Sequence, residues 1–232
     1  MLRQLAVEEV RPFRFMDWHD GYAYFIGYKN DNKVFIKIDL FLQFLGNDHL
    51  SFTILQNKVN LLPITEFWSK NGYQVLIYPF VEGQNLTESD LIEKPSLLND
   101  IFNTLEILNQ QGLIHRDIRL ENFMLINDEL FIIDFTFIST LPHAMDKYDF
   151  KKLDAHDPRQ KKILRKLGAR INPRDYVWND FYSVAQVIRK ILNNNKSLSH
   201  DVIEALEQSL KSFETTSKRS HTTYNLIEDI NS

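Results

Sequence analysis

The first eighty residues contain short apolar runs separated by Gly, Asn and Asp. Runs of about four to eight residues that are rich in aromatic and β-branched side chains predict β-strands. A single helical pattern, over residues 48–58, interrupts them. We therefore expect a small sheet with one helix, whose five strands cover residues 13–18, 22–28, 33–39, 61–68 and 73–78.

From residue 81 onward the apolar spacing changes to the period of helices. Apolar residues recur at helical intervals over residues 96–111, and Gly112 ends that pattern. The runs at 123–126 and 130–133, joined by an Asn-Asp pair, predict a β-hairpin. Further helices are expected from about residue 178 and over residues 198–213.

Composition limits the class of protein. The 232-residue chain is 44% hydrophobic and 25% charged, which suits a packed core and argues against global disorder. There are no cysteines, so disulfides, thiol nucleophiles and cysteine-ligated metal sites are excluded. No apolar run suggests a signal peptide or reaches the roughly 18 residues of a membrane span, so we expect a cytoplasmic protein. The predicted domains are an N-terminal part at 1–80 with the sheet and its helix, a helical part at 81–213 and a polar tail at 214–232.

One acid, one amide and a second acid follow one another at fixed spacing in the middle of the chain. Asp117 ends the tripeptide His-Arg-Asp, Asn122 follows five residues later, and Asp134 follows twelve residues after that. In this spacing, and in the apolar runs beside both acids, the sequence resembles the protein-kinase-like superfamily, with its motifs H-R-D-x-x-x-x-N and D-F-G. The third residue of the second motif is Thr136 here.

The resemblance implies an α+β, bilobal protein-kinase-like fold with a small β-rich N-lobe and a reduced helical C-lobe. It implies that Asp117 orients the acceptor hydroxyl and accepts its proton, and that Asn122 and Asp134 hold Mg²⁺ on the phosphates. Arg119 stands where the family often has a lysine that contacts the transferred phosphate. In the family, the acid at Asp180 hydrogen-bonds back to the catalytic loop.

Lys37 lies inside the apolar run of the third predicted strand. Two interpretations are open: an edge-strand lysine that faces water, or the family's strand lysine that holds the α- and β-phosphates of ATP. Strand alternation places Lys37 on the same face as Phe35, opposite Val34, Ile36 and Ile38. The motifs downstream favour the second interpretation.

Two parts of the nucleotide site depart from the family pattern. The phosphate loop has one glycine, Gly21, so fewer backbone N–H groups can approach the phosphates. The best register of the first helix puts Ser51 where the family has a glutamate that pairs with the strand lysine. Lys37 is therefore held by Asp134 alone, by another acid, or less well.

The stretch from Tyr78 to Gly83 resembles the hinge between kinase lobes. There Phe80 and Val81 are expected to meet the adenine, through the Val81 amide or the carbonyl of Pro79. The cofactors that the resemblance implies are ATP and Mg²⁺.

Residues 147–174 contain ten Lys or Arg against three Asp, and a helix with a basic face is predicted within them, between Asp157 and Gly168. Three interpretations compete: a solvated helix face, recognition of an anionic glycan or lipid headgroup, and contact with a membrane surface through residues 157–170. Nucleic acid is not expected, because aromatic residues are sparse there and the net charge of the chain is −4.

The leading hypothesis is a kinase that uses ATP and Mg²⁺ to phosphorylate a hydroxyl, and that acts on a lipopolysaccharide or other cell-surface glycan sugar or on a glycolipid, at the inner membrane surface. The basic segment and the short C-terminal part favour that acceptor. A serine/threonine protein kinase with a protein acceptor is the alternative enzyme. The third hypothesis is a pseudokinase or scaffold that binds a partner, which Ser51, Thr136 and the single glycine favour.

Overall fold

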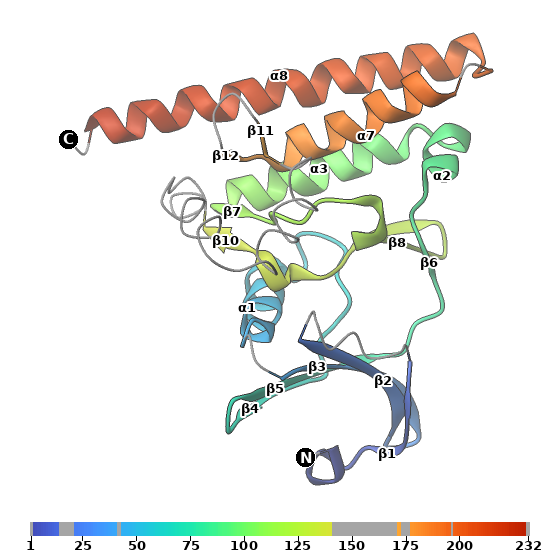
Figure 1. Cartoon of the computed structure of the whole chain (residues 1–232), viewed down its shortest axis with the longest axis vertical. Helices are drawn as coiled ribbons and strands as arrows, with labels where there is room; N and C mark the ends of the chain where they lie inside the picture. The colour runs from blue at the N-terminus through green and yellow to red at the C-terminus, as the bar shows by residue number, and fades with distance from the viewer. Residues whose placement is uncertain are drawn as a thin grey trace. The chain divides into compact units, whose positions relative to one another are not determined.

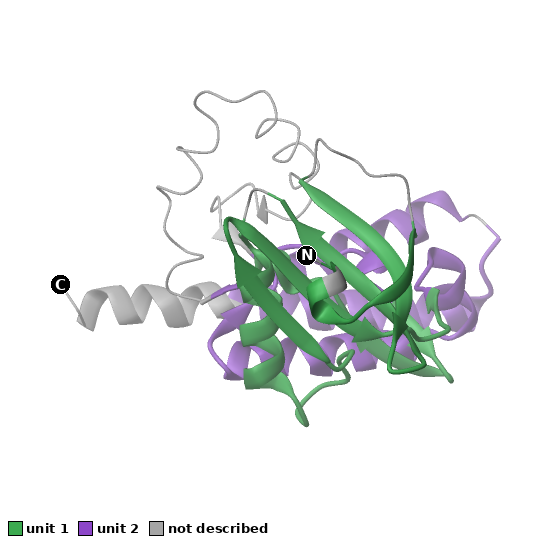
Figure 2. Cartoon of the chain, turned by 90° about the horizontal axis from the view of Figure 1, so that it is seen from below, with its two compact units in different colours: residues 1–84, 124–138 green, residues 85–123, 139–232 purple. Residues whose placement is uncertain are grey.

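The computed structural model describes residues 2–13, 21–40, 43–140, 171–172, 177–195 and 197–230. The chain folds into two compact units (Figure 2). Unit 1 comprises residues 1–84 and 124–138, and unit 2 comprises residues 85–123 and 139–232. Most of the first predicted strand lies outside the described residues, as does the basic helix with the membrane contact predicted for 157–170.

Unit 1 contains a five-stranded antiparallel sheet (Figure 1). Its order is β1-β2-β3-β5-β4, so β3 is the central strand. The helix α1 (Leu45–Leu55) follows β3 in the chain, and a short 3-10 helix (Leu2–Leu5) precedes β1. The strands are β1 (Glu8–Pro12), β2 (Tyr22–Lys29), β3 (Asn32–Asp39), β4 (Glu66–Lys70) and β5 (Tyr73–Pro79).

The sheet has two faces of different chemistry, because successive side chains of a strand point to opposite sides. One face is aliphatic: Val34, Ile36 and Ile38 of β3 are buried there with Val75 and Ile77 of β5. This cluster supplies most of the apolar core of the sheet.

The opposite face, called the lysine face below, carries polar and aromatic side chains. Lys37 and Phe35 share it, as the alternation predicts. Leu45 of α1 packs against it, so this helix covers part of the face. Cross-strand pairing places on it Tyr22, Tyr24, Ile26, Phe35, Lys37, Asp39, Gln74, Leu76 and Tyr78.

The first observed strand begins earlier than the sequence predicts. β1 covers Glu8–Pro12, whereas the predicted strand begins at residue 13, and all five residues of β1 are exposed. It is the outer strand of the sheet, and its register against β2 is irregular between Glu8 and Arg11. Charged residues, proline and irregular register protect an edge strand from further pairing. Such a strand has no apolar alternation, so the hydrophobic pattern could not reveal it.

The predicted β-hairpin is present. β8 (Phe123–Ile126) and β9 (Glu129–Ile132) are joined by Asn127 and Asp128, which both have positive φ, as a tight two-residue turn requires. Together with β6 (Gln84–Asn85) they form a three-stranded sheet in the order β6-β8-β9.

The strand predicted at 61–68 is shorter than expected. Leu61 makes an isolated parallel bridge with Ile132, and β4 begins only at Glu66. The apolar residues before Glu66 contribute to packing instead, since Leu62 and Ile64 contact the cluster on the lysine face.

Unit 2 is mainly helical. Phe102, Phe181 and Phe213 join three of its helices, with the ring centroid of Phe102 5.3 Å from that of Phe181 and 5.1 Å from that of Phe213. The helices are α2 (Glu88–Glu93), α3 (Leu97–Gln110), α7 (Asp180–Asn194) and α8 (His200–Ile230). The short strands pair as β7 (Leu113–Ile114) with β10 (Ser139–Thr140) and β11 (Ile171–Asn172) with β12 (Val177–Trp178).

Helix α8 is longer than the sequence predicts. The polar stretch after residue 213 is predicted to be a tail, but the helix continues to Ile230. No Gly or Pro occurs between His200 and Ile230, so no backbone signal ends the helix where its apolar period fades. Ser217, beyond the predicted end, is buried. Within the part of the chain that the structure describes, no helix is both long and apolar enough to span a membrane.

Candidate functional site

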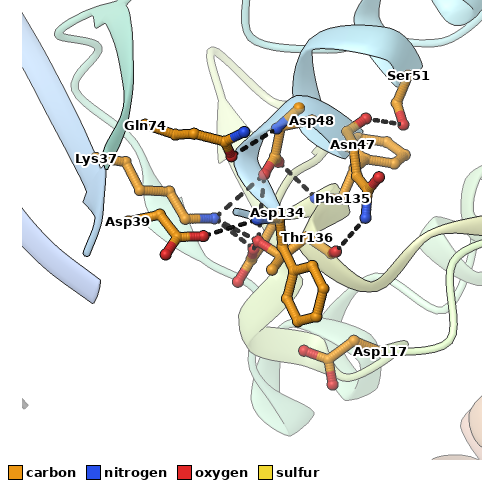
Figure 3. A network of polar contacts seen from close by, with 12 residues as sticks. Lys37, Asp39, Asn47, Asp48, Ser51, Gln74, Asp117, Asp134, Phe135 and Thr136 are labelled. Atoms are coloured by element: carbon orange, nitrogen blue, oxygen red, sulfur yellow. Dashed lines mark hydrogen bonds and ion pairs between the residues drawn. The ribbon is translucent and has the colours of Figure 1, made fainter. Parts of the chain in front are cut away.

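Lys37 lies at the centre of a buried polar network on the lysine face (Figure 3). Its Nζ atom is 2.7 Å from Oδ1 of Asp134 and 3.4 Å from Oδ2 of Asp48. The same nitrogen is 2.7 Å from Oγ1 of Thr136. Because Lys37 is only 5% exposed, these oxygens take the place of water around its ammonium group. Lys37 is therefore not an edge-strand lysine that faces solvent.

Asp48, on α1, is a second acid beside Lys37 that the sequence motifs do not identify. Its carboxylate also accepts a hydrogen bond from the N–H of Phe135, at 2.8 Å, and lies 3.2 Å from Oγ1 of Thr136. Asp48 thus contacts the strand lysine and the chain segment after Asp134 at the same time. This answers the question that the missing glutamate raises: another acid helps to hold the lysine.

Ser51 is the position that the family pattern assigns to the lysine's partner. In the structure its hydroxyl donates to the carbonyl of Asn47, at 2.6 Å, within α1. Residues three apart on a helix share a face, so an acid at position 48 can reach the same partner from one turn earlier. An acidic residue one turn from the expected position, on the buried side of the helix, is the signal that could have found Asp48.

Thr136 supplies a hydroxyl that connects the network. Its Oγ1 is 2.6 Å from Oδ1 of Asp134, closer than it is to Asp48. A hydroxyl has one proton to donate, so Thr136 accepts from Lys37 and donates to a carboxylate, of which Asp134 is the nearer. The amide of Asn47 donates to the carbonyl of Thr136 at 2.9 Å, which fixes the backbone of this residue against α1.

Asp134 has an uncommon backbone conformation, with φ 63° and ψ 66°. This left-handed region is sparsely populated by residues other than glycine, and residues held there are concentrated at functional sites. The bonds of Asp134 to Lys37 and Thr136, and the bond of Phe135 to Asp48, hold the strained segment in place.

The described residues of the network include more acids than bases. Lys37 faces Asp48 and Asp134, and Asp39, which is buried nearby, accepts the N–H of Phe44 at 2.7 Å. Burial by itself would lower the pKa of Lys37, but attraction to Asp134 and Asp48 raises it well above its ordinary value. Burial also raises the pKa of Asp48, against the attraction of Lys37. An excess of buried negative charge favours the binding of a further cation.

Asp117 and Asn122, in unit 2, contact each other directly. Nδ2 of Asn122 donates to the backbone carbonyl of Asp117 at 2.8 Å and to its Oδ2 at 2.9 Å. Nε of Arg119 is 3.8 Å from the same Oδ2. Asp117 and Asn122 are buried, whereas the Arg119 side chain is 45% exposed. The loop from Asp117 to Asn122 is therefore held at both ends by buried residues, while Arg119 within it remains accessible to solvent.

His115 and Asp180 hold the backbone of this loop. The carboxylate of Asp180, at the start of α7, accepts the N–H of His115 at 2.7 Å and the N–H of Arg116 at 3.0 Å. The N–H of Asp117 lies 3.3 Å from Nδ1 of the fully buried His115. Arg116 has a φ of 66°, so the Asp180 bonds hold a second left-handed residue in place.

The other predicted nucleotide residues, Gly21, Phe80 and Val81, lie in unit 1. Gly21 has a φ of 76°, and its carbonyl accepts the N–H of Leu40 at 3.0 Å. Phe80 donates its N–H to the carbonyl of Lys33 at 2.9 Å. Because the N–H of Phe80 is engaged within the chain, this N–H is not the group that would bind a base.

Aromatic rings lie on the lysine face beside Lys37. Tyr24 and Phe35 are stacked with ring centroids 6.0 Å apart. Phe13 lies edge-on to Phe35 at 5.4 Å and to Phe80 at 6.4 Å. Phe13 is 43% exposed and the other three are half-buried, so these rings retain surface for a ligand.

The predicted site residues form one group in each unit. Lys37 and Asp134 are together in unit 1, and Asp117, Arg119 and Asn122 are together in unit 2. Across the described ranges, no three or more His, Cys, Asp or Glu side chains form a cluster that could hold a metal. The accessible carboxylate of Asp134 suits Mg²⁺, which proteins bind by one or two carboxylates together with substrate phosphates and water.

Asp48 provides a test of the network that needs no assay of function. Asp48→Ala is expected to lower the free energy of unfolding by about 3 kcal/mol, because the buried N–H of Phe135 loses its acceptor and Lys37 loses a counter-charge. Asp48→Asn keeps an acceptor and should cost about 1 kcal/mol. Thr53→Ala, on the exposed side of α1, is the matched control. If denaturant unfolding gave Asp48→Ala the same free energy of unfolding as Thr53→Ala, the buried role of Asp48 would be contradicted.

Comparison with known proteins gives a fold. No protein-family model and no curated protein matches the sequence. Among solved structures, the chain is similar to that of the Cydia pomonella granulovirus kinase PK-1, with a TM-score of 0.63 and 14% identity over 93% of this chain and 91% of that one. At this identity the likeness shows the fold alone. The prediction is confirmed: the chain has an α+β, protein-kinase-like fold with a β-sheet N-terminal region and a helical C-terminal part.

Proposed function

We propose that this chain is a kinase that transfers the γ-phosphoryl group of ATP to a hydroxyl acceptor. The observation that carries the proposal is the ion pair between the buried Lys37 and the partly exposed Asp134, to which Asp48 of α1 adds a second carboxylate. The Asp134 side chain is still 29% exposed, so this carboxylate remains open to a ligand. A lysine held by acids beside an accessible carboxylate is suited to binding a metal-bound phosphate.

Phosphoryl transfer requires positioning and charge neutralisation rather than covalent catalysis. In unit 1, Lys37 would bind the phosphates. In unit 2, Asp117 would orient the acceptor hydroxyl and accept its proton, and Arg119 would contact the transferred group. The contact of Asn122 with Oδ2 of Asp117 keeps that carboxylate in one orientation.

Asp134 and Asn122 are the residues that would hold Mg²⁺. The excess of carboxylates around Lys37 supports a cation in unit 1. Among the described residues, the Asn122 side chain makes both of its hydrogen bonds through its amide nitrogen, which leaves the oxygen as a donor atom for a metal. When bound, Mg²⁺ would neutralise charge on the phosphates.

The aromatic rings beside Lys37 support a nucleotide as the phosphate donor. Every base has a π-face that stacks on aromatic side chains, with about 1–3 kcal/mol per stacked base. Phe35 lies two residues from Lys37 on β3, a separation of about 7 Å along a strand. A base on this surface would therefore have its phosphates near the lysine.

For the acceptor we propose a cell-surface glycan sugar or glycolipid, and a protein hydroxyl is the alternative. The support is the local excess of basic residues at 147–174, which suits an anionic acceptor and a location at the inner face of the membrane. The scaffold hypothesis remains the non-enzymatic alternative. Against it stands Asp48, which supplies the counter-charge that Ser51 lacks.

A labelling experiment separates these alternatives. Purified protein is expected to show a Mg·ATP-dependent rise in Tm and to transfer label from γ-labelled ATP to a component of a fractionated extract. Label in polysaccharide or lipid would identify the proposed acceptor class, and label in protein the alternative. Asp134→Asn should abolish transfer, at least about a hundredfold, while the fold is retained. Neither a Tm shift nor label with any fraction would refute the proposed function.

A further inference from the structure

The ammonium group of Lys37 has three N–H donors. The described residues place three acceptor oxygens around it, at 2.7 Å from Asp134, 2.7 Å from Thr136 and 3.4 Å from Asp48. The ring of Tyr22 is also close, with its centroid 5.2 Å from Nζ. The N–H groups of Lys37 that a phosphate oxygen would need are thus already directed at Asp134, Thr136 and Asp48.

Thr136 differs from the two acids because it contacts both members of the central pair. Its Oγ1 accepts from Lys37 and donates to Oδ1 of Asp134 at 2.6 Å. The residue is 2% exposed, and the bond from Asn47 fixes its backbone. The hydroxyl therefore links the ammonium group of Lys37, which would bind a phosphate, to the carboxylate of Asp134, which would bind a metal.

We propose that Thr136 competes internally with the nucleotide: its hydroxyl holds Lys37 and Asp134 together in the unliganded protein and so lowers the affinity for Mg·ATP. The inference rests on the proposed function and adds a residue that sets its nucleotide affinity. A ligand phosphate must displace the hydroxyl from Lys37, and a metal must displace it from Asp134. A residue without a hydroxyl at this position leaves one Lys37 donor available.

The test uses the full chain with Val, Ser or Thr at position 136. Thr136→Val keeps the shape of the side chain and removes the hydroxyl, and each hydrogen bond that the ligand no longer has to break is worth about a fivefold change in Kd. Two hydrogen bonds of the hydroxyl are involved, one to Lys37 and one to Asp134, so calorimetric titration with Mg·ATP should give a Kd about 25-fold lower for Thr136→Val than for the natural chain. Thr136→Ser keeps the hydroxyl and should resemble the natural chain.

A second readout distinguishes competition from a merely structural role. Without ligand, Thr136→Val should have a lower Tm, because the network loses hydrogen bonds, although its nucleotide affinity is higher. If the hydroxyl had only a structural role, Thr136→Val would lower both the Tm and the affinity for Mg·ATP. Equal or weaker Mg·ATP binding by Thr136→Val would overturn the inference and leave the proposed function intact. Absence of binding in every variant, including the natural chain, would refute both, whereas binding by Thr136→Val alone would support the inference strongly.

Discussion

Replacing Asp117 by Asn is expected to lower kcat for phosphoryl transfer about a thousandfold and to leave the fold unchanged. The carboxylate is the proposed acceptor of the hydroxyl proton, and general-base catalysis of this kind contributes about 10²–10⁴-fold. Asn has the same shape but is not a base. The contact with Nδ2 of Asn122 can persist, because the new amide still offers an oxygen.

The matched control for this substitution is Asp128→Asn. Asp128 lies in the turn between β8 and β9 with a φ of 65°, a conformation that Asn adopts readily. Its kcat and its Tm should equal those of the natural chain. Single-turnover measurements at saturating Mg·ATP would separate chemistry from binding. An Asp117→Asn variant that retained a tenth of the natural kcat would show that this acid is not the proton acceptor.

Replacing Lys37 by Met is expected to remove nucleotide binding and to destabilise the fold by about 4 kcal/mol. The loss of stability follows because removal of one partner leaves buried charge without compensation. Asp48 is 3% exposed and would keep only neutral partners, the N–H of Phe135 and the hydroxyl of Thr136. Lys70→Met, at the exposed end of β4, is the matched control and should cost less than about 1 kcal/mol.

The destabilisation by Lys37→Met should depend on pH. Burial already raises the pKa of Asp48 in the folded protein, and loss of Lys37 would raise it further. A carboxyl group with a raised pKa in the folded state costs stability above that pKa, and the cost disappears as pH falls towards the ordinary Asp value of about 4. The stability difference between Lys37→Met and the natural chain should therefore be larger at pH 8 than at pH 5.

A double variant gives a further check on the same pair. Lys37→Met with Asp48→Asn removes one buried charge of each sign. The double variant should therefore lose about 1–3 kcal/mol less unfolding free energy than the sum of the losses in the two single variants. Strict additivity, measured by denaturant unfolding at pH 8, would show that Lys37 and Asp48 do not interact.

The strands at the centre of the sheet were predictable because their residues alternate between two buried environments. β2, β3 and β5 begin within one residue of the predicted positions. β1 was not predictable, because a strand exposed on both faces carries no such signal. The apolar pattern predicts the end of α8 too early, because a helix can continue through polar residues when no Gly or Pro interrupts its backbone.

The site divides in a similar way. Lys37, Asp117, Asn122 and Asp134 could be named from spacing, because motif positions are local in sequence. Asp48 and Thr136 could not be joined from the sequence, since they are 88 residues apart and meet only through side chains. The sequence shows Thr136 only as a departure from a glycine motif, whereas in the structure its hydroxyl contacts Lys37, Asp134 and Asp48.

The position of Asp48 on α1 has a practical consequence for following ligand binding. Any ligand that separates Lys37 from its acids must change the forces on this helix. Leu50, two residues from Asp48, is 57% exposed, and the natural chain contains no cysteine. A single Leu50→Cys substitution would therefore accept one fluorescent label at one site, and the emission of that label would report nucleotide binding without a radioactive substrate or a known acceptor.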